Sequence, residues 1–239
     1  MTFPPCVRLF GLLLGLLSCV HGAAQFVVER SPWLDGEAVT EEPVHQKWAV
    51  ADQSTAQLIR AELTVEGLNP RKPVRLRVDK DTTMKLAPYR RYSRLCVEPD
   101  FMLYADYIFA DPNIQTDTLL LEPLAIGLET ALPAIEFMPG TEDLYFTSLP
   151  ALEALRGFIE VNPTVSVAII GHEGEGTTEQ HRTSRNRARA VFEYLVSSGI
   201  KANRLSVEGR GSEQRLYPKP ATPEEAEANR RISIRVTKY

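Results

Sequence analysis

The chain has 239 residues, of which 44% are hydrophobic and 24% are charged, and this composition is typical of a globular protein rather than a disordered or collagen-like one. At roughly 100–200 residues per domain, the length fits one large domain or two small ones. The net charge of −4, from 27 basic and 31 acidic side chains, argues against a dedicated nucleic-acid-binding protein. Three cysteines are too few for a disulfide scaffold or a cysteine-rich zinc module.

Residues 1–24 have the pattern of a secretory signal peptide. Arg8 precedes an apolar run from Leu9 to Val20, and small residues lead to a cleavage site after Ala24. The apolar run is too short to span a bilayer. An alternative is that Leu16–Cys19 acts as a lipobox, which makes Cys19 a lipidation candidate and would anchor the chain to a membrane surface. We therefore expect secretion across the inner membrane to the periplasm or the outer membrane.

The next two segments differ in pattern. Residues 25–54 are mixed in composition and are expected to form a linker or an irregular arm. Residues 55–129 contain short runs of alternating polarity separated by turn residues every 8–12 positions, which predicts a small β-sandwich. Cys96 lies in one of these runs and is expected to be a small buried side chain. Nothing in this segment suggests catalysis.

Residues 130–239 alternate between strand and helix patterns. A short strand is expected at Ile135–Phe137, and a helix is expected to start at Thr147–Pro150 with a hydroxyl cap and a proline in the first turn. The sequence Asn162-Pro163 should end that helix, and Gly199 should end the next one. A loop rich in proline and acids is expected after Gly211. The predicted fold class is α+β, with a small β-sandwich followed by helices packed on one mixed sheet.

Six motifs in this part occur in the order found in one family. They are Ile135-Glu136-Phe137, Gly171-His172, Thr183-Ser184-Arg185-Asn186-Arg187-Ala188, Gly199-Ile200, Gly209-Arg210-Gly211 and Asn229-Arg230-Arg231-Ile232. Together they resemble the OmpA-like peptidoglycan-binding domain of outer-membrane protein A, peptidoglycan-associated lipoprotein and the stator protein MotB. More weakly, the preceding segment resembles a carboxypeptidase-regulatory-like or transthyretin-like β-domain of the Bacteroidota type.

The resemblance implies a ligand and a site. Members of the family hold the diaminopimelate of the peptidoglycan peptide stem, which presents an ammonium and a carboxylate close together. A carboxylate at a strand end and an arginine on the following helix can clamp such a zwitterion. Arg187 takes the place of the family arginine, because the residues after it match only in that register. The neighbouring Arg182, Arg185 and Arg189 are then expected to be surface residues.

The partner carboxylate departs from the family pattern. Its aspartate is matched by Glu173 if the loop is shortened, or by Glu175 as the nearest substitute without a gap. Gln180 replaces the family asparagine before the helix, and Arg230 on the last strand is a further candidate for the site. Gly171 and His172 border the loop, and His172 is expected to pack and form hydrogen bonds rather than to catalyse.

The function that we predict is non-covalent peptidoglycan binding, which would link an outer-membrane or envelope structure to the cell wall. Envelope proteins are possible partners of the β-domain, and nucleic acid is not. The alternative is a structural component of a secretion or motility assembly that has lost this binding. No enzymatic activity, cofactor or metal is expected, because His172, Glu173 and His181 lack the spacing of a metal site.

Overall fold

The structure, a computed structural model, describes residues 26–27, 42–68, 72–80, 82–139, 141–174 and 177–239. The predicted signal peptide and its lipidation candidate Cys19 lie outside these residues. No helix in the described part of the chain is long and apolar enough to cross a membrane.

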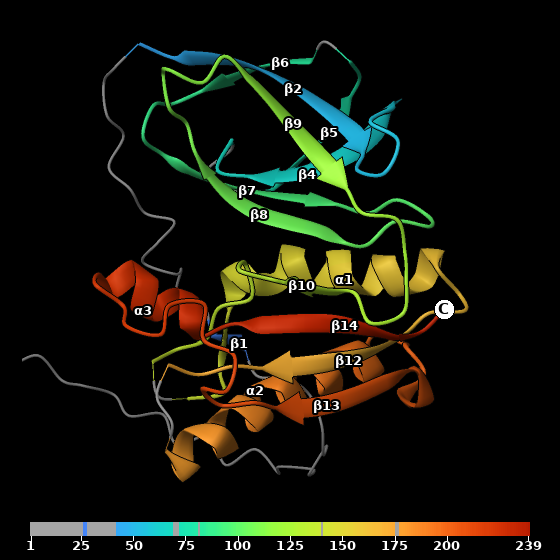
Figure 1. Cartoon of the computed structure of the whole chain (residues 1–239), viewed down its shortest axis with the longest axis vertical. Coiled ribbons are helices and arrows are strands. Elements are labelled where there is room, and N and C mark those ends of the chain that lie inside the picture. The colour runs from blue at the N-terminus through green and yellow to red at the C-terminus, as the bar shows by residue number, and fades with distance from the viewer. Residues whose placement is uncertain (1–25, 28–41, 69–71, 81, 140, 175–176) are drawn as a thin grey trace, which may run out of the picture.

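The first half of the described chain forms two stacked four-stranded sheets (Figure 1). One sheet contains β2 (Val44–Asp52), β3 (Leu58–Ile59), β6 (Thr82–Leu86) and β9 (Thr116–Leu121). The other has the order β5-β4-β7-β8 and contains β4 (Ala61–Glu66), β5 (Val74–Val78), β7 (Arg91–Cys96) and β8 (Tyr104–Phe109). The strands predicted from alternating polarity are therefore present, and their inward side chains form one apolar core.

The prediction of an irregular arm is wrong for Val44–Asp52, which form the central strand β2. Val44, Gln46, Trp48 and Val50 alternate with more exposed residues and are buried against the second sheet. The strand pairs with β6 on one side and with β9, in parallel, on the other. The sandwich thus begins about ten residues before the predicted boundary at residue 55.

A buried cation lies inside the sandwich. The Arg94 guanidinium donates to Asp106 and Asp117 and lies 5.0 Å from the centre of the Trp48 ring. These carboxylates balance its charge and raise its pKa against the opposing effect of burial. Nearby, Cys96 is buried as expected, and burial raises the pKa of its thiol to about 12.

The second half is built on a mixed sheet with the order β10-β14-β12-β13. Its strands are β10 (Glu129–Ala131), β12 (Ser166–Gly171), β13 (Leu205–Gly209) and β14 (Ile232–Lys238). Only the β12–β13 pair is parallel. The helices α1 (Leu149–Val161) and α2 (Thr178–Ser197) pack on the face that carries Val167, Ile169 and Ile234. This arrangement confirms the predicted α+β class.

Two local predictions about the start of this half are wrong. Ile135–Phe137 do not form a strand of the sheet, because the chain leaves the sheet at Pro133, which has no N–H to donate. Instead, the segment pairs with the short strand β11 (Leu144–Tyr145), which also pairs with β1 (Phe26–Val27). The Ser148 hydroxyl does not cap α1, since it donates to the carbonyl of Glu136 and accepts from its N–H.

The region predicted as a loop after Gly211 contains a third helix, α3 (Pro223–Asn229). The Thr222 hydroxyl accepts from the N–H of Glu225, and the Glu225 carboxylate accepts from the N–H of Ala221. This is a capping arrangement, with Pro223 at the first helical position. The remaining short elements are two 3₁₀ turns, η2 (Phe146–Ser148) and η3 (Ala202–Arg204).

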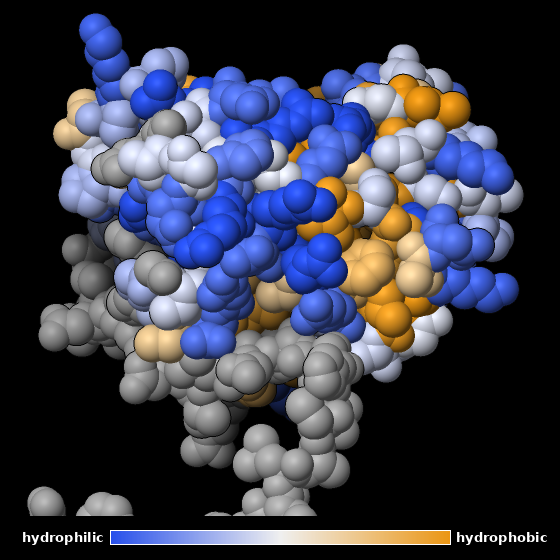
Figure 2. Space-filling view, turned by 90° about the horizontal axis from the view of Figure 1, so that it is seen from below, coloured by the Kyte–Doolittle hydropathy of each residue, from blue (hydrophilic) through white to orange (hydrophobic). Residues whose placement is uncertain are grey.

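The helix α1 lies between the sandwich and the second sheet (Figure 1). Its side chains Leu152, Leu155 and Phe158 share one apolar core with β12, β14 and α2, and this core also includes Leu95 of β7 and Leu103. The two halves are therefore joined by a continuous core. On the opposite side, where α2 and β13 lie in Figure 1, hydrophilic side chains cover much of the surface (Figure 2).

Two glycines let α2 lie directly on the sheet. A Cβ added at Gly171 would lie 1.8 Å from the carbonyl oxygen of Ser184, and one added at Gly209 would lie 2.5 Å from the Cβ of Arg185. Both positions therefore require glycine for close approach rather than for backbone conformation. A third glycine, Gly157 in α1, would meet nothing within 4 Å if it carried a Cβ.

We predict opposite effects of the same substitution at two of these sites. Gly171→Ala should lower the free energy of unfolding by about 1–3 kcal/mol or more, because α2 must move away from β12. Gly157→Ala should raise it by up to about 1 kcal/mol, because alanine favours the helix interior. Urea unfolding of both variants measures these changes. Equal stability of the two variants would contradict the close packing of α2 on the sheet.

Candidate functional site

The candidate site lies where β12 ends and α2 begins. β12 ends at Gly171, and His172 and Glu173 follow directly. The helix α2 begins at Thr178, and the Thr177 hydroxyl caps it by accepting from the N–H of Gln180 at 3.2 Å. Because Gly171 holds the helix against the strand, residues on the inner face of α2 lie close to the strand end.

The structure brings Arg187 and Glu173 together at this point. The Arg187 Nη1 donates to the Glu173 Oε1 at 2.6 Å, and the two side chains are only 8% and 4% exposed. The two charges are thus adjacent and removed from water, an arrangement that requires each to satisfy the other. Of the two candidate carboxylates, Glu173 is the one described beside the arginine, and Glu175 lies outside the described residues.

Backbone carbonyls complete the surroundings of the guanidinium. The Arg187 Nε donates to the carbonyl of Thr141 at 2.9 Å, and Nη2 lies 3.5 Å from the carbonyl of Met138. The guanidinium carbon is also 5.1 Å from the centre of the Phe137 ring. A guanidinium has five N–H donors, so donors remain after the bonds to Glu173, Thr141 and Met138.

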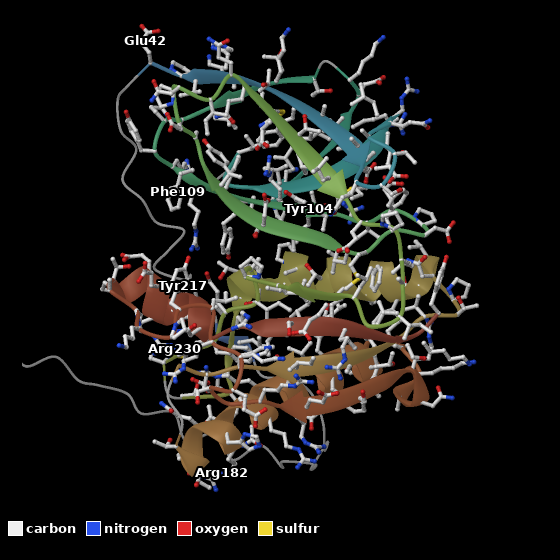
Figure 3. All side chains as sticks on the ribbon, in the orientation of Figure 1. Glu42, Tyr104, Phe109, Arg182, Tyr217 and Arg230 are labelled. Atoms are coloured by element: carbon white, nitrogen blue, oxygen red, sulfur yellow. The ribbon has the colours of Figure 1, made fainter. Side chains whose placement is uncertain are left out.

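Charges from α3 reach the same site. Burial lowers the pKa of Arg187, whereas the carboxylates of Glu173 and Glu227 oppose that effect and Arg230 adds to it. Arg230 and Glu227 form an ion pair at the edge of the site, where Arg230 lies beside α3 (Figure 3). A Cβ added at Gly174 would come within 3.8 Å of the Ala226 carbonyl, so α3 packs directly beside the loop. Arg230 is therefore a rim residue with an acidic neighbour.

His172 is held in a separate hydrogen-bond chain on the far face of the sheet. Its Nε2 lies 2.9 Å from the Ser233 hydroxyl, which donates to the Glu129 carboxylate at 2.5 Å. Since the hydroxyl has one hydrogen, His172 must be the donor from Nε2, which leaves Nδ1 unprotonated. Nδ1 has no hydrogen-bond partner in the described structure. His172 is thus buried and hydrogen-bonded on the face of the sheet away from the helices.

The remaining predicted residues have structural positions. Gly171 sets the approach of α2, and Gln180 lies in the first turn of α2, about 10 Å along the axis from Arg187. The three other arginines of α2 are not buried in the way that Arg187 is, and Arg182 is 69% exposed at the end of the helix (Figure 3).

Two residues that form hydrogen bonds around the site, Ser184 and Glu129, were not identified from the sequence. The buried Ser184 hydroxyl donates to the His181 carbonyl and accepts from the N–H of Gly211, which fixes the loop after β13. Its place in the Thr183-Ser184 motif was a usable signal. Glu129 is too far from His172 in sequence for any local pattern to connect them.

We predict that His172 makes stability depend on pH. Burial, with help from Arg231, lowers its pKa to about 4, below the ordinary value of 6.5. Between these values the unfolded chain binds one more proton, so the free energy of unfolding should fall by roughly 3 kcal/mol in total as the pH drops from 7 to 4. His172→Gln should remove this part of the slope in urea unfolding curves measured across that range. An unchanged slope in the variant would show that His172 is not the group responsible.

This chain was compared with known proteins and with protein-family models. Among solved structures, a putative MotB-like protein from Desulfovibrio vulgaris is 20% identical, covers 46% of this chain and 74% of its own, and has a TM-score of 0.42. The periplasmic domain of Helicobacter pylori MotB is 19% identical, with coverages of 49% and 80% and a TM-score of 0.43. The cell wall anchor of the T6SS from Pseudomonas aeruginosa is 22% identical, with coverages of 43% and 75% and a TM-score of 0.37. A search of curated proteins found no match. The model of the OmpA family matches residues 136–230, and this part of the chain is therefore an OmpA-like domain.

Proposed function

We propose that this protein binds peptidoglycan non-covalently and links an outer-membrane or envelope structure to the cell wall. Its ligand would be the diaminopimelate of the peptide stem. The ligand carboxylate would accept from free N–H groups of Arg187, and the ligand ammonium would donate to Glu173. The role is binding rather than catalysis.

The observation that carries this proposal is the 2.6 Å contact between the Arg187 guanidinium and the Glu173 carboxylate. A clamp for a zwitterion needs one group of each charge within the span of one amino acid, and this pair provides both. The pair also occupies the strand end and the helix position that the OmpA-like resemblance implies. Glutamate is one methylene longer than the family's aspartate, so the geometry of this clamp would differ from the family's.

Ligand entry requires a local change at the site. Arg187 is 6% exposed, so the ligand must separate the guanidinium from Glu173 in part or bind to the donors beside it. The ligand would replace one charge-assisted contact with two, one on each member of the pair. The adjacent ion pair of Arg230 and Glu227 would supply further charges at the rim.

The envelope location is part of the same proposal. It rests on the signal-like pattern of residues 1–24, with Cys19 as a site of lipid attachment, and on the OmpA-like domain. The sandwich, beginning at Val44, would then contact an envelope protein, and the domain from about residue 130 onwards would contact the cell wall.

The burial of Arg187 and Glu173 also favours a second candidate function. The guanidinium already has three protein acceptors, Glu173, Thr141 and Met138, which is the arrangement of a structural ion pair. The protein would then be a component of an envelope assembly that keeps the OmpA-like fold without binding peptidoglycan.

We predict that the wild-type protein sediments with purified sacculi that contain diaminopimelate. Arg187→Ala should remove at least nine-tenths of the bound protein, because the ligand carboxylate loses its cation. Arg182→Ala, on the same helix but exposed, should bind like the wild type. Quantifying the protein in the pellet and supernatant measures the effect.

A second variant separates loss of binding from loss of folding. Removing Arg187 alone leaves Glu173 buried without its partner, which costs about 3–5 kcal/mol, whereas replacing both charges with Arg187→Met and Glu173→Met is far less disruptive. The double variant should remain folded by circular dichroism and should not sediment. Binding by this folded double variant would refute the clamp, and absence of binding by the wild type would favour the second function.

A further inference from the structure

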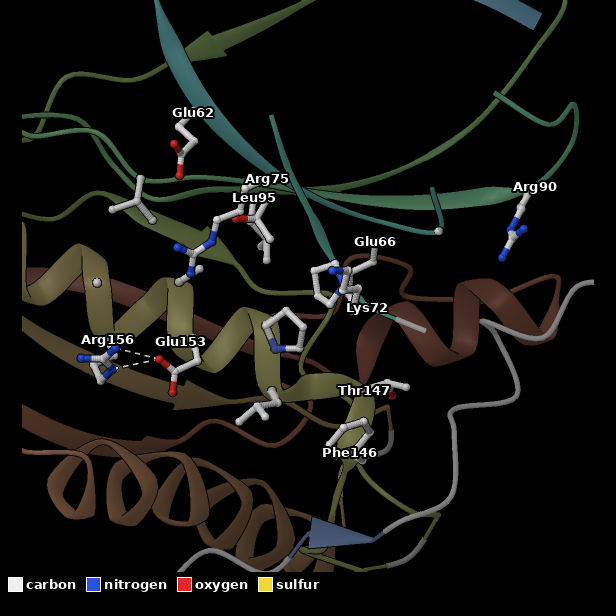
Figure 4. A pocket seen from close by; sticks show the side chains of 18 residues that line it. Glu62, Glu66, Lys72, Arg75, Arg90, Leu95, Phe146, Thr147, Glu153 and Arg156 are labelled. Carbon is white, nitrogen blue, oxygen red and sulfur yellow. Dashed lines mark hydrogen bonds and ion pairs between the residues drawn. The ribbon is translucent and has the colours of Figure 1, made fainter. Parts of the chain in front are cut away.

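A second site lies between the sandwich and α1. A cavity of about 640 Å³ separates the outer face of the sheet β5-β4-β7-β8 from that helix (Figure 4). Thr64 and Leu95 of the sheet form one side with Val97, which follows β7, and Leu149 and Ala154 of α1 form the other. This volume is in the range of ligand-binding clefts, and the lining is largely apolar.

Three of the cations around this cavity are not paired with any residue that the structure describes. Lys72, Arg75 and Arg90 line it, and none of their side chains forms a hydrogen bond or ion pair with another residue that the structure describes. Arg75 affects Glu153 only through the field of its charge. These three cations are therefore available to an anionic partner.

The acids around the cavity offset this charge only in part. Glu153 is already engaged by Arg156 and by the Tyr194 hydroxyl. Glu66 accepts from the Ser93 hydroxyl, and burial raises its pKa to about 7, so it is only partly ionised at neutral pH. Glu62 lies at one end (Figure 4). The cavity thus favours negative charge in whatever fills it.

The cations are spread along the cavity rather than gathered at one point. Arg75 lies opposite Thr64, which pairs with Leu95, and Arg90 precedes Leu95 by five residues on an extended chain. At about 3.4 Å per residue, Arg75 and Arg90 are therefore roughly 17 Å apart along the sheet. Figure 4 shows Arg90 at one end, Lys72 in the middle and Arg75 towards the other end. A ligand with a single anionic group would reach only one of them.

Two further features lie on the wall of the cavity that η2 and α1 form. The Thr147 hydroxyl lines the cavity, is buried and has no hydrogen-bond partner in the described structure. Gly157 also lines the cavity, and the space beside its Cα is empty. A glycine inside a helix costs about 1 kcal/mol relative to alanine, and no contact with a residue in the described ranges requires it here.

We propose that this cavity binds an extended acidic segment of a partner protein, with apolar side chains against Leu95 and Ala154 and carboxylates on Lys72, Arg75 and Arg90. Alternate side chains of an extended peptide point in opposite directions, so one set faces the apolar walls while the other faces the cations. This site is independent of the Arg187 site and would serve the partner side of an envelope linker.

The test uses a fluorescein-labelled nine-residue peptide of alternating glutamate and leucine, titrated with the full-length protein and followed by fluorescence anisotropy. The wild type should bind it, more weakly at high salt, and should bind the matched glutamine–leucine peptide at least tenfold more weakly. Arg75→Glu should weaken binding of the acidic peptide at least tenfold. Lys85→Glu, which makes the same charge change on an exposed residue of the other sheet, should alter it less than threefold.

A steric variant tests the place of binding. Gly157→Trp should block the cavity and reduce binding at least tenfold, whereas Gly157→Ala should bind within threefold of the wild type and raise Tm by about 2–4 °C. The proposal is overturned if the acidic peptide does not bind, or if Arg75→Glu and Lys85→Glu reduce binding equally. It is also overturned if dodecanoate binds at the cavity and the peptide does not, because the occupant is then an anionic amphiphile.

Discussion

The candidate site of the OmpA-like domain depends on one buried contact, the ion pair of Arg187 and Glu173. Two opposite charges are withdrawn from water at the junction of β12 and α2, and each lies within hydrogen-bond distance of the other, which offsets the cost of burying them. The carbonyl of Thr141 satisfies a further donor of the guanidinium. The pair exists because Gly171 lets α2 approach the strand more closely than any larger residue would. The lack of a side chain at Gly171 of β12 therefore lets the ion pair form at the end of that strand.

The two halves of the chain share more than a connection. The apolar core of the OmpA-like domain continues through α1 to Leu95 of the sandwich. Polar contacts support it: Arg91 pairs with Glu136 at 3.1 Å, and the Asn162 side chain accepts from the N–H of Asp100 at 3.0 Å. The Asn162 amide also donates to the carbonyl of Phe158 at the end of α1. Asn162, which follows the last residue of α1, thus also connects this helix to the sandwich. The cavity beside α1 lies between the helix and the sandwich, which are in contact elsewhere.

The strands and the main helices could be predicted because their patterns are local. Alternating polarity predicted strands in the segment that forms β4 to β9, and the sequence Asn162-Pro163 marked the end of α1 correctly. β2 was missed although its burial alternates as clearly, because prolines and acids before it suggested an arm. α3 was missed because prolines concealed the capping sequence Thr222–Glu225. For both β2 and α3, the prolines and acids nearby led to the prediction of a loop, although the alternation of β2 and the capping sequence of α3 indicated the correct element.

The choice of Arg187 could be predicted as well, since the residues after the arginine fixed its register, whereas the sequence left Glu173 and Glu175 open as its acidic partner. The hydrogen bonds between segments that are far apart in the sequence could not be predicted. Ser233 and Glu129 are 104 residues apart, and Gln46 reaches the carbonyl of Asp111 across 65. Such contacts follow from the order of the strands in the sheets, which alternation alone does not determine.

The clamp can be tested most directly by calorimetric titration with two soluble muropeptides that differ only at the third stem residue, diaminopimelate in one and lysine in the other. Lysine lacks the second carboxylate, so it offers nothing for the Arg187 guanidinium to bind while keeping the ammonium. The account predicts measurable binding of the diaminopimelate form and at least tenfold weaker binding of the lysine form. Equal affinity for the two, or binding of neither, would contradict it.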